Sequence, residues 1–146
     1  MKAEELMIGD WVKVFDGFKR ITQIRNVSNK KEFYSVWCDE WGMYESDLEP
    51  IPLTAEILEK NGFHKQKWND LVTEFVFATD LNQSPQTVIQ FTFYSKEIEG
   101  VRSLLKMWTK SKFGHGQNDV HLCGIYYVHE LQHALRLCGI DKEIIL

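Results

Sequence analysis

The chain has 146 residues, of which 44% are apolar and 26% charged, and a formal net charge of −4, values that suit a soluble globular protein of one ordinary or two small domains. No apolar run approaches the roughly 20 residues of a membrane span, and the opening "MKAEELMIGDWV" lacks the long apolar region of a signal peptide. We therefore expect a cytoplasmic protein with no membrane partner, and the acidic balance disfavours nucleic acid as its main partner.

The first 52 residues alternate short β-type runs with turn residues. The runs lie at 10–15, 18–27, 32–38 and 43–45. Asp16-Gly17 is a strong hairpin signal, and four or five short strands in so short a stretch predict a small, bent antiparallel barrel. The string I-G-D-x-V at 8–12 resembles the opening of SH3-like barrels. We therefore expect an SH3-like β-barrel over residues 1–52.

A boundary follows this segment. Pro50 and Pro52 mark it, because proline cannot donate a hydrogen bond within a central strand. The next stretch, "LTAEILEKNGF", predicts a two-turn helix with Thr54 as the N-cap and Asn61-Gly62 as the stop. We expect a second, α+β part over residues 53–146.

The remainder of the chain predicts an antiparallel sheet. In "DLVTEFVFATD" and "TVIQFTFYS" each strand has one apolar face, as in a sheet covered on one side. Residues 96–112 fit helix and strand periods alike, and Gly100 favours a strand. "VHLCGI" and "KEIIL" are further short strand candidates. The expected fold class is α+β, with a small SH3-like barrel followed by an antiparallel sheet and one or two flanking helices.

The segment "YYVHELQHALRLCGI" contains His129, Glu130 and His133 in the spacing H-E-x-x-H. In zinc peptidases, two histidines four residues apart on a helix hold the metal, and the glutamate acts as general base. On this interpretation Glu130 is catalytic, His129 and His133 are metal ligands, and zinc is the cofactor of a hydrolase.

Helix geometry gives the same string another explanation. On a helix over 127–138, Val128, Leu131 and Leu135 gather on one side, and both histidines fall on nearly the opposite side. We expect the helix to bury its apolar side and to leave both imidazoles facing water. The motif would then be an accident of a helix that packs a core.

A zinc site would also need a third ligand. Where the metzincin pattern has glycine and a further histidine, this chain has Arg136 and Gly139, and Gly139 is well placed as the stop of the helix. Upstream, His115, His121 and Cys123 are the candidates that remain. Our main expectation is therefore no catalytic residue, no metal ligand and no cofactor, with the zinc-dependent hydrolase as the alternative.

The first segment is dense in aromatic residues. Small barrels of the SH3 type expose some rings to grip a peptide or to stack on a base, although such rings also fill small cores. The candidate partner-binding residues are Trp11, Tyr34, Trp37, Trp41 and Tyr44. The leading hypothesis is a non-enzymatic protein-binding module with a protein partner.

A further alternative is weak nucleic-acid binding through a local basic patch of the barrel. Net charge does not fix how charges are distributed, so a basic patch is compatible with an acidic chain. Its candidate residues are Lys19, Arg20, Arg25, Lys30 and Lys31. Such binding would weaken steeply with salt.

The three cysteines carry little signal. Cys38, Cys123 and Cys138 form no C-x-x-C pair, and an odd, sparse set is not a disulfide framework. We expect buried or half-buried thiols in a reducing compartment.

Two strings, "IPLTAEILEKNGF" and "YVHELQHALRLCGIDKEI", together resemble a group of uncharacterised short bacterial proteins of the prophage and mobile-element type. The resemblance implies a two-part organisation with an N-terminal barrel-like segment. It implies no assigned activity and supplies no catalytic residues.

Overall fold

The computed structural model describes the chain except residues 16, 28–33, 68–71, 79–85, 99–100, 112–113 and 116–119. At a further set of strand positions it describes the backbone alone: 67, 86–87, 94–98, 101–102, 104–111, 114–115 and 120–123. The chain forms two compact units. The first unit comprises Met1–Pro52 and Tyr127–Lys142, and the second comprises Leu53–Tyr126 and Glu143–Leu146.

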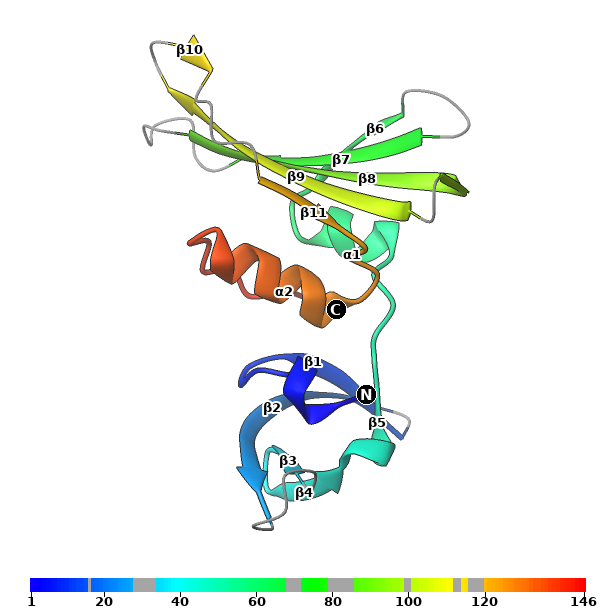
Figure 1. Ribbon diagram of the computed structural model, residues 1–146, viewed down its shortest axis with the longest axis vertical. Helices are drawn as coiled ribbons and strands as arrows, with labels where there is room; N and C mark the ends of the chain where they lie inside the picture. The colour runs from blue at the N-terminus through cyan, green and yellow to red at the C-terminus, as the bar shows by residue number, and fades with distance from the viewer. Residues whose placement is uncertain are drawn as a thin grey trace. The chain divides into compact units, whose positions relative to one another are not determined.

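The first unit contains a curled five-stranded antiparallel sheet with the order β4-β3-β2-β1-β5 (Figure 1). Its strands are β1 (Trp11–Val14), β2 (Gly17–Asn26), β3 (Tyr34–Cys38), β4 (Trp41–Tyr44) and β5 (Leu48–Glu49). Two short 3-10 helices, η1 (Ala3–Glu5) and η2 (Glu45–Asp47), flank it. The four named runs overlap β1 to β4, and β5 follows them, which confirms the expected four or five short strands of one antiparallel sheet.

The curl of this sheet comes from β2. Its first half pairs with β1, and its second half pairs with β3 after a register shift between Ile21 and Gln23. A bulge of this kind bends a strand and increases its twist, so one long strand can serve both sides of a curled sheet. The expected turn residue Asp16 lies outside the described residues, and Gly17 already belongs to β2, opposite Val14.

Alternate residues of the curled sheet point inward and form the core of the first unit. Because successive side chains of a strand point to opposite faces, every second residue can be buried. The buried core residues are Ala3, Leu6, Val12, Val14, Ile21, Val36, Cys38 and Leu48.

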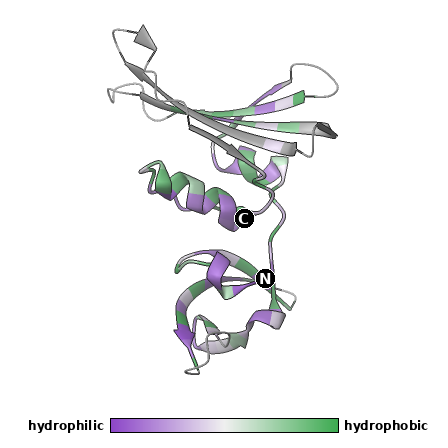
Figure 2. Cartoon of the chain, in the orientation of Figure 1, coloured by the Kyte–Doolittle hydropathy of each residue, from purple (hydrophilic) through white to green (hydrophobic). Residues whose placement is uncertain are grey.

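The helix of the first unit is α2 (Val128–Leu137), which carries hydrophobic and hydrophilic residues along its whole length (Figure 2). Its start is tied to the chain before the boundary, since the backbone N–H of Val128 donates to the carbonyl oxygen of Ile51 at 2.9 Å. Its end is the expected glycine stop. Gly139 has a φ of 70°, and Ile140 N–H donates to the Leu135 carbonyl at 2.9 Å, which is the Schellman pattern.

The second unit begins with α1 (Ala55–Lys60), which confirms the expected short helix. Thr54 caps it, since its Oγ1 accepts a hydrogen bond from the Ile57 N–H at 3.3 Å. Gly62, with a φ of 77°, follows the last turn, and the Phe63 N–H donates to the Leu58 carbonyl at 3.0 Å. Both expected signals, the cap and the stop, act as the sequence predicts.

A larger antiparallel sheet completes the second unit, with α1 lying on one of its faces (Figure 1). Its strands follow the order β10-β9-β8-β7-β6, and β11 also pairs with β9. They are β6 (His64–Lys67), β7 (Val72–Ala78), β8 (Gln86–Ile98), β9 (Val101–Ser111), β10 (Gly114–His115) and β11 (Val120–Cys123). The ambiguous segment before residue 112 is therefore a strand, as expected.

The apolar face expected for this sheet is present. Phe75 lies opposite Phe91, and Phe77 lies opposite Ile89, so their side chains share one face. Phe75, Ile89 and Phe91 are fully buried, and the rings of Phe63 and Phe77 lie 5.3 Å apart. This sheet is the antiparallel sheet expected in the second part of the chain.

Two expectations differ from the structure. The final strand expected in "KEIIL" is wrong: none of residues 141–146 lies in a strand. The buried Asn61 side chain instead takes both backbone groups of Ile145, accepting from its N–H at 2.9 Å and donating to its carbonyl at 2.8 Å. The terminal helix, which we placed with residues 53–146, groups with the first unit, because its polar side bonds to the N-terminal segment as described below. Among the described residues, no helix has the length and apolarity needed to cross a membrane.

Candidate functional site

The polar side of α2 is organised around one buried carboxylate, that of Asp10. Its Oδ2 lies 2.7 Å from Nε2 of His133 and accepts from the Met7 N–H at 2.7 Å. Its Oδ1 accepts from Nη1 of Arg136 at 2.9 Å. Asp10 has 0% exposure, so its charge depends on these donors rather than on water. His133 and Arg136 are therefore engaged in a structural ion cluster.

Gln132 extends this contact to the backbone of the same segment. Its Oε1 accepts from the Trp11 N–H at 3.0 Å, and its Nε2 donates to the Gly9 carbonyl at 3.1 Å. Gln132 is buried, so both of its polar groups have replaced water with protein partners. The backbone of residues 9–11 is thus hydrogen-bonded to the polar side of α2.

His129 is buried rather than exposed, with 4% of its surface accessible. Its ring stacks on Tyr127, with the centroids 5.8 Å apart, and meets His133 edge-on at 5.9 Å. Its Nδ1 is buried and has no hydrogen-bond partner among the described residues. Burial lowers the pKa of His129, although the nearby carboxylates of Glu130 and Asp10 oppose this effect. The imidazole is therefore held in its neutral form.

The expectation that both imidazoles face water is wrong. It assumed that α2 buries only its apolar side. The opposite side is also covered, because its polar side chains pack against the buried Asp10. A helix wheel gives the angle between side chains and does not show what else packs against them.

The zinc alternative meets a specific geometric difficulty. Nε2 of His133 is turned to Asp10, and the Glu130 carboxylate accepts from the Tyr127 N–H at 3.0 Å, closing the first turn of α2. The H-E-x-x-H residues do line a hollow of about 520 Å³ with Glu5, Pro50 and Tyr127. In the part of the chain that the structure describes, however, no three His, Cys, Asp or Glu side chains are grouped so as to hold a metal ion.

The candidate third ligands His115, His121 and Cys123 belong to β10 and β11, where the backbone alone is described. Within the H-E-x-x-H string, His133 and Glu130 already have structural partners, whereas Nδ1 of His129 has none among the described residues.

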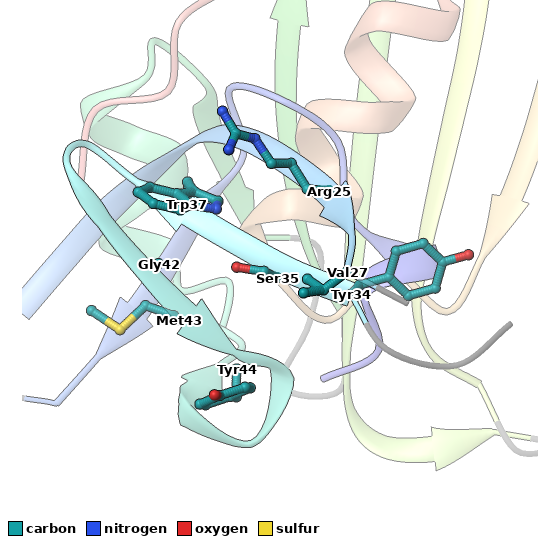
Figure 3. Close-up of a pocket in the computed structure, with 8 residues that line it drawn as sticks. All are labelled: Arg25, Val27, Tyr34, Ser35, Trp37, Gly42, Met43 and Tyr44. Carbon is teal, nitrogen blue, oxygen red and sulfur yellow. The ribbon is translucent and has the colours of Figure 1, made fainter. Parts of the chain in front are cut away.

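A second hollow lies on the curled sheet and gathers most of the predicted aromatic residues (Figure 3). It is a groove of about 630 Å³ over β2, β3 and β4. Its lining residues are Arg25, Val27, Tyr34, Ser35, Trp37, Gly42, Met43 and Tyr44. We call it the Trp37 groove. Three of the five predicted partner-binding residues line it: Tyr34, Trp37 and Tyr44.

Trp37 lines this groove, and its cross-strand neighbour is a glycine. Gly42 pairs with Trp37 between β3 and β4, and a Cβ at Gly42 would lie only 3.2 Å from Cε2 of the indole. The ring therefore leans over a position that no larger residue could occupy without displacing it. The indole Nε1 is buried and has no acceptor within the described structure.

Arg25 covers the indole from the neighbouring strand, and Figure 3 shows its side chain over Trp37. The guanidinium carbon lies 5.2 Å from the ring centroid, a distance typical of a cation–π contact. From the sequence, Arg25 was predicted only as a member of a basic patch, and its position beside Trp37 was not predicted. The alternation of β2 and β3 places it on the same face as Trp37, but only once their register is known.

The two other predicted partner-binding residues lie outside the groove. Trp41 belongs to β4 and is 71% exposed, but it does not line the hollow. Trp11 lies on β1, half-buried, with the guanidinium of Arg20 5.8 Å from its ring centroid. The predicted aromatic group is thus divided into a groove cluster, one exposed ring and one ring near α2.

The predicted basic patch is dispersed where the structure describes it. Lys19 is paired with Asp39 at 3.3 Å, Arg20 contacts Trp11, and Arg25 contacts Trp37. Lys30 and Lys31 lie outside the described residues. The described members therefore do not form one continuous cationic surface.

The cysteines act as packing residues where their side chains are described. Cys38 is a buried core residue and Cys138 is half-buried, both free. Burial raises the pKa of each thiol, so neither is activated as a nucleophile. The Cys123 side chain lies outside the description.

The chain matches no known family model, and comparison with curated proteins and with solved structures also finds no match.

Proposed function

We propose that the chain is a non-enzymatic protein-binding module and that its Trp37 groove receives a segment of a protein partner. The observation that supports this is a groove on the curled sheet lined by three aromatic rings, of which Tyr44 is exposed and Tyr34 and Trp37 are half-buried. Tyr44 is 72% exposed, and the indole N–H of Trp37 has no acceptor in the described structure. Aromatic side chains at a surface groove are typical of peptide recognition.

We further propose that the curled sheet is an SH3-like barrel. Its five strands, its antiparallel pairing and the bulge in β2 are compatible with a small barrel. We also propose an origin in a prophage or mobile element. This proposal depends only on the resemblance carried by the strings "IPLTAEILEKNGF" and "YVHELQHALRLCGIDKEI".

The zinc-dependent hydrolase receives less support. Its proposed base, Glu130, is used as a helix cap, and one of its two proposed ligands is bonded to Asp10 through Nε2. Nucleic-acid binding also receives less support, because a phosphate backbone requires several clustered cations and Arg25 is the one cation among the described residues that line the groove.

The chain offers a matched pair of variants for testing the groove. Tyr44 and Trp41 lie on the same strand and are 72% and 71% exposed, but only Tyr44 lines the groove. We expect a partner recovered from native lysate in stoichiometric amount to be lost with Tyr44→Ala and with Trp37→Ala. We expect Trp41→Ala to retain it.

Two outcomes would reject the proposal. One is recovery of the partner unchanged by Tyr44→Ala and Trp37→Ala. The other is loss of the partner with Trp41→Ala to the same degree as with Tyr44→Ala, which would mean that the surface is non-specifically adhesive. The thermal midpoint of each variant checks that the sheet is intact, and Tyr44→Ala is the safer test because its side chain is exposed.

A further inference from the structure

We infer that the segment received by the Trp37 groove is an extended peptide that carries an acidic side chain, whose carboxylate pairs with Arg25. This inference rests on the proposed function and adds the chemistry of the partner. It follows from which polar groups of the groove lack a partner.

Arg25 has no carboxylate partner within the described structure. It is exposed, and among the residues that the structure describes it forms no ion pair, since its side-chain contact is the Trp37 ring. Two other cations of the same sheet do have carboxylates: Lys13 pairs with Glu49 at 2.7 Å and Lys19 pairs with Asp39 at 3.3 Å. The guanidinium of Arg25 therefore remains available to a carboxylate from outside, which it can bind through two parallel hydrogen bonds.

The charge of the groove favours an acidic ligand. Among the described residues that line it, none is an aspartate or a glutamate, and Arg25 supplies a positive charge. A ligand that carries a carboxylate complements this lining, whereas a cationic side chain placed beside Arg25 would be repelled by it. The indole Nε1–H of Trp37 is buried and has no partner among the described residues, so Arg25 is the donor that faces the ligand.

The rest of the groove suits an extended chain. Val27, Met43 and the rings of Tyr34 and Tyr44 supply apolar contacts beside Arg25. In an extended peptide, alternate side chains point the same way, so apolar residues can lie on these contacts while one acidic residue reaches Arg25. A nucleic-acid strand also carries acceptors, but its affinity depends on several cations at once, and the chain has a net charge of −4.

The test is selection from a displayed library of random short peptides against the immobilised full-length chain. Peptides selected by the unmodified chain are expected to be enriched in Asp or Glu at one fixed position. A synthetic peptide of the selected sequence should bind Arg25→Glu about tenfold or more weakly. Changing its acidic residue to lysine should weaken binding to the unmodified chain and restore binding to Arg25→Glu. This reciprocal rescue is a result that misfolding of a variant cannot produce.

Three results would count against the proposals, and they are distinguishable. Selected peptides that need Tyr44 but show no acidic preference, or whose affinity Arg25→Glu leaves unchanged, would overturn the inference and leave the protein-binding function standing. No selected peptide that depends on Tyr44 would overturn both. Binding of a single-stranded oligothymidylate at low salt, lost with Arg25→Glu in the absence of any selected peptide, would overturn both in favour of nucleic acid. The thermal midpoint of Arg25→Glu is the folding control.

Discussion

Asp10 Oδ2 lies 2.7 Å from Nε2 of His133, a residue 123 positions later in the chain. The same carboxylate accepts from Arg136 one helical turn further on. An H-E-x-x-H string that suggests a zinc peptidase by spacing therefore places its second histidine against a buried carboxylate. The contact explains why a polar side of α2 is covered, and it makes the stability of the first unit depend on Asp10.

Removing the Asp10 carboxylate is expected to destabilise the chain. Asp10→Ala leaves the Met7 N–H and the His133 and Arg136 side chains without their acceptor. Because the Arg136 side chain is 36% exposed and can be hydrated, a loss of about 1–3 kcal/mol is expected. Asp10→Asn keeps the shape but replaces one acceptor oxygen with an NH2 group that faces another N–H donor, so a loss of similar size is expected. Urea unfolding followed by tryptophan fluorescence measures both. Equal stability of the Asp10→Ala variant and the unmodified chain would show that the cluster contributes nothing.

His129 predicts a loss of stability on mild acidification. Because burial lowers the pKa of His129 in the folded chain below its ordinary value of 6.5, the unfolded chain binds a proton that the folded chain resists. The free energy of unfolding should therefore be unaffected by His129 above pH 7.5 and should fall as pH drops below 6.5. The slope contributed by one such proton is at most about 1.4 kcal/mol per pH unit.

A His129→Phe variant isolates this contribution. Its phenyl ring can still stack on Tyr127 but cannot take up a proton. We expect the unmodified chain to lose stability relative to this variant as the pH falls from 7.5 to 5.5. Parallel pH profiles over that range would mean that His129 does not resist protonation in the folded chain.

Gly42 predicts an effect on binding with little effect on folding. A Cβ at this position would lie 3.2 Å and 3.3 Å from two indole atoms of Trp37, so in Gly42→Ala the ring or its strand must shift by a few tenths of an ångström. Because Gly42 is exposed, we expect a change in thermal midpoint of no more than a few degrees and a loss of affinity for a selected peptide of about fivefold or more. Unchanged affinity, measured by fluorescence anisotropy of the labelled peptide, would contradict the central role given to the Trp37 ring.

The left-handed backbone at the end of α2 predicts a cost for a side chain there. Gly139 has a φ of 70° and nothing within 4 Å of where a Cβ would lie, so Gly139→Ala meets backbone strain without a steric clash. A loss of about 1 kcal/mol is expected. Gly17→Ala is the control, since the nearest atom to its Cβ would be 4.0 Å away and no left-handed φ is involved. Similar losses for both variants in urea unfolding would refute the strain argument.

Metal analysis separates the two interpretations of the H-E-x-x-H string. Protein purified without a histidine tag is expected to carry less than about a tenth of an equivalent of zinc, because His133 and Glu130 already have structural partners. His133→Ala should leave that value unchanged and should lower the unfolding free energy. Stoichiometric zinc that disappears with His133→Ala would favour the hydrolase.

Local patterns in the sequence were good predictors of local structure. Thr54, Asn61 and Gly139 are caps and stops whose chemistry acts within one helical turn, and each occurs where the pattern predicts it. The alternation that placed Phe75 and Phe77 on one face also depends only on strand geometry.

Relationships between distant segments were not predictable in the same way. The hydropathy of α2 cannot reveal that Asp10 needs His133 and Arg136, because that need arises only when the two segments meet. The same holds for "KEIIL", where the buried Asn61 takes the backbone groups of Ile145 that a strand neighbour would have used. At the groove, the sequence marked the aromatic residues, and only the register of β2 with β3 shows that Arg25 joins them.

The discontinuity of the first unit has a consequence for synthesis on the ribosome. Residues 1–52 emerge long before 127–142, and at roughly 5–20 residues per second the interval lasts several seconds. During that time the nascent curled sheet holds an acid whose cationic partners have not yet been translated. The unit should therefore complete its folding late, after the intervening segment has been made, and a ribosome-bound chain stalled before residue 127 should leave the N-terminal segment open to proteolysis.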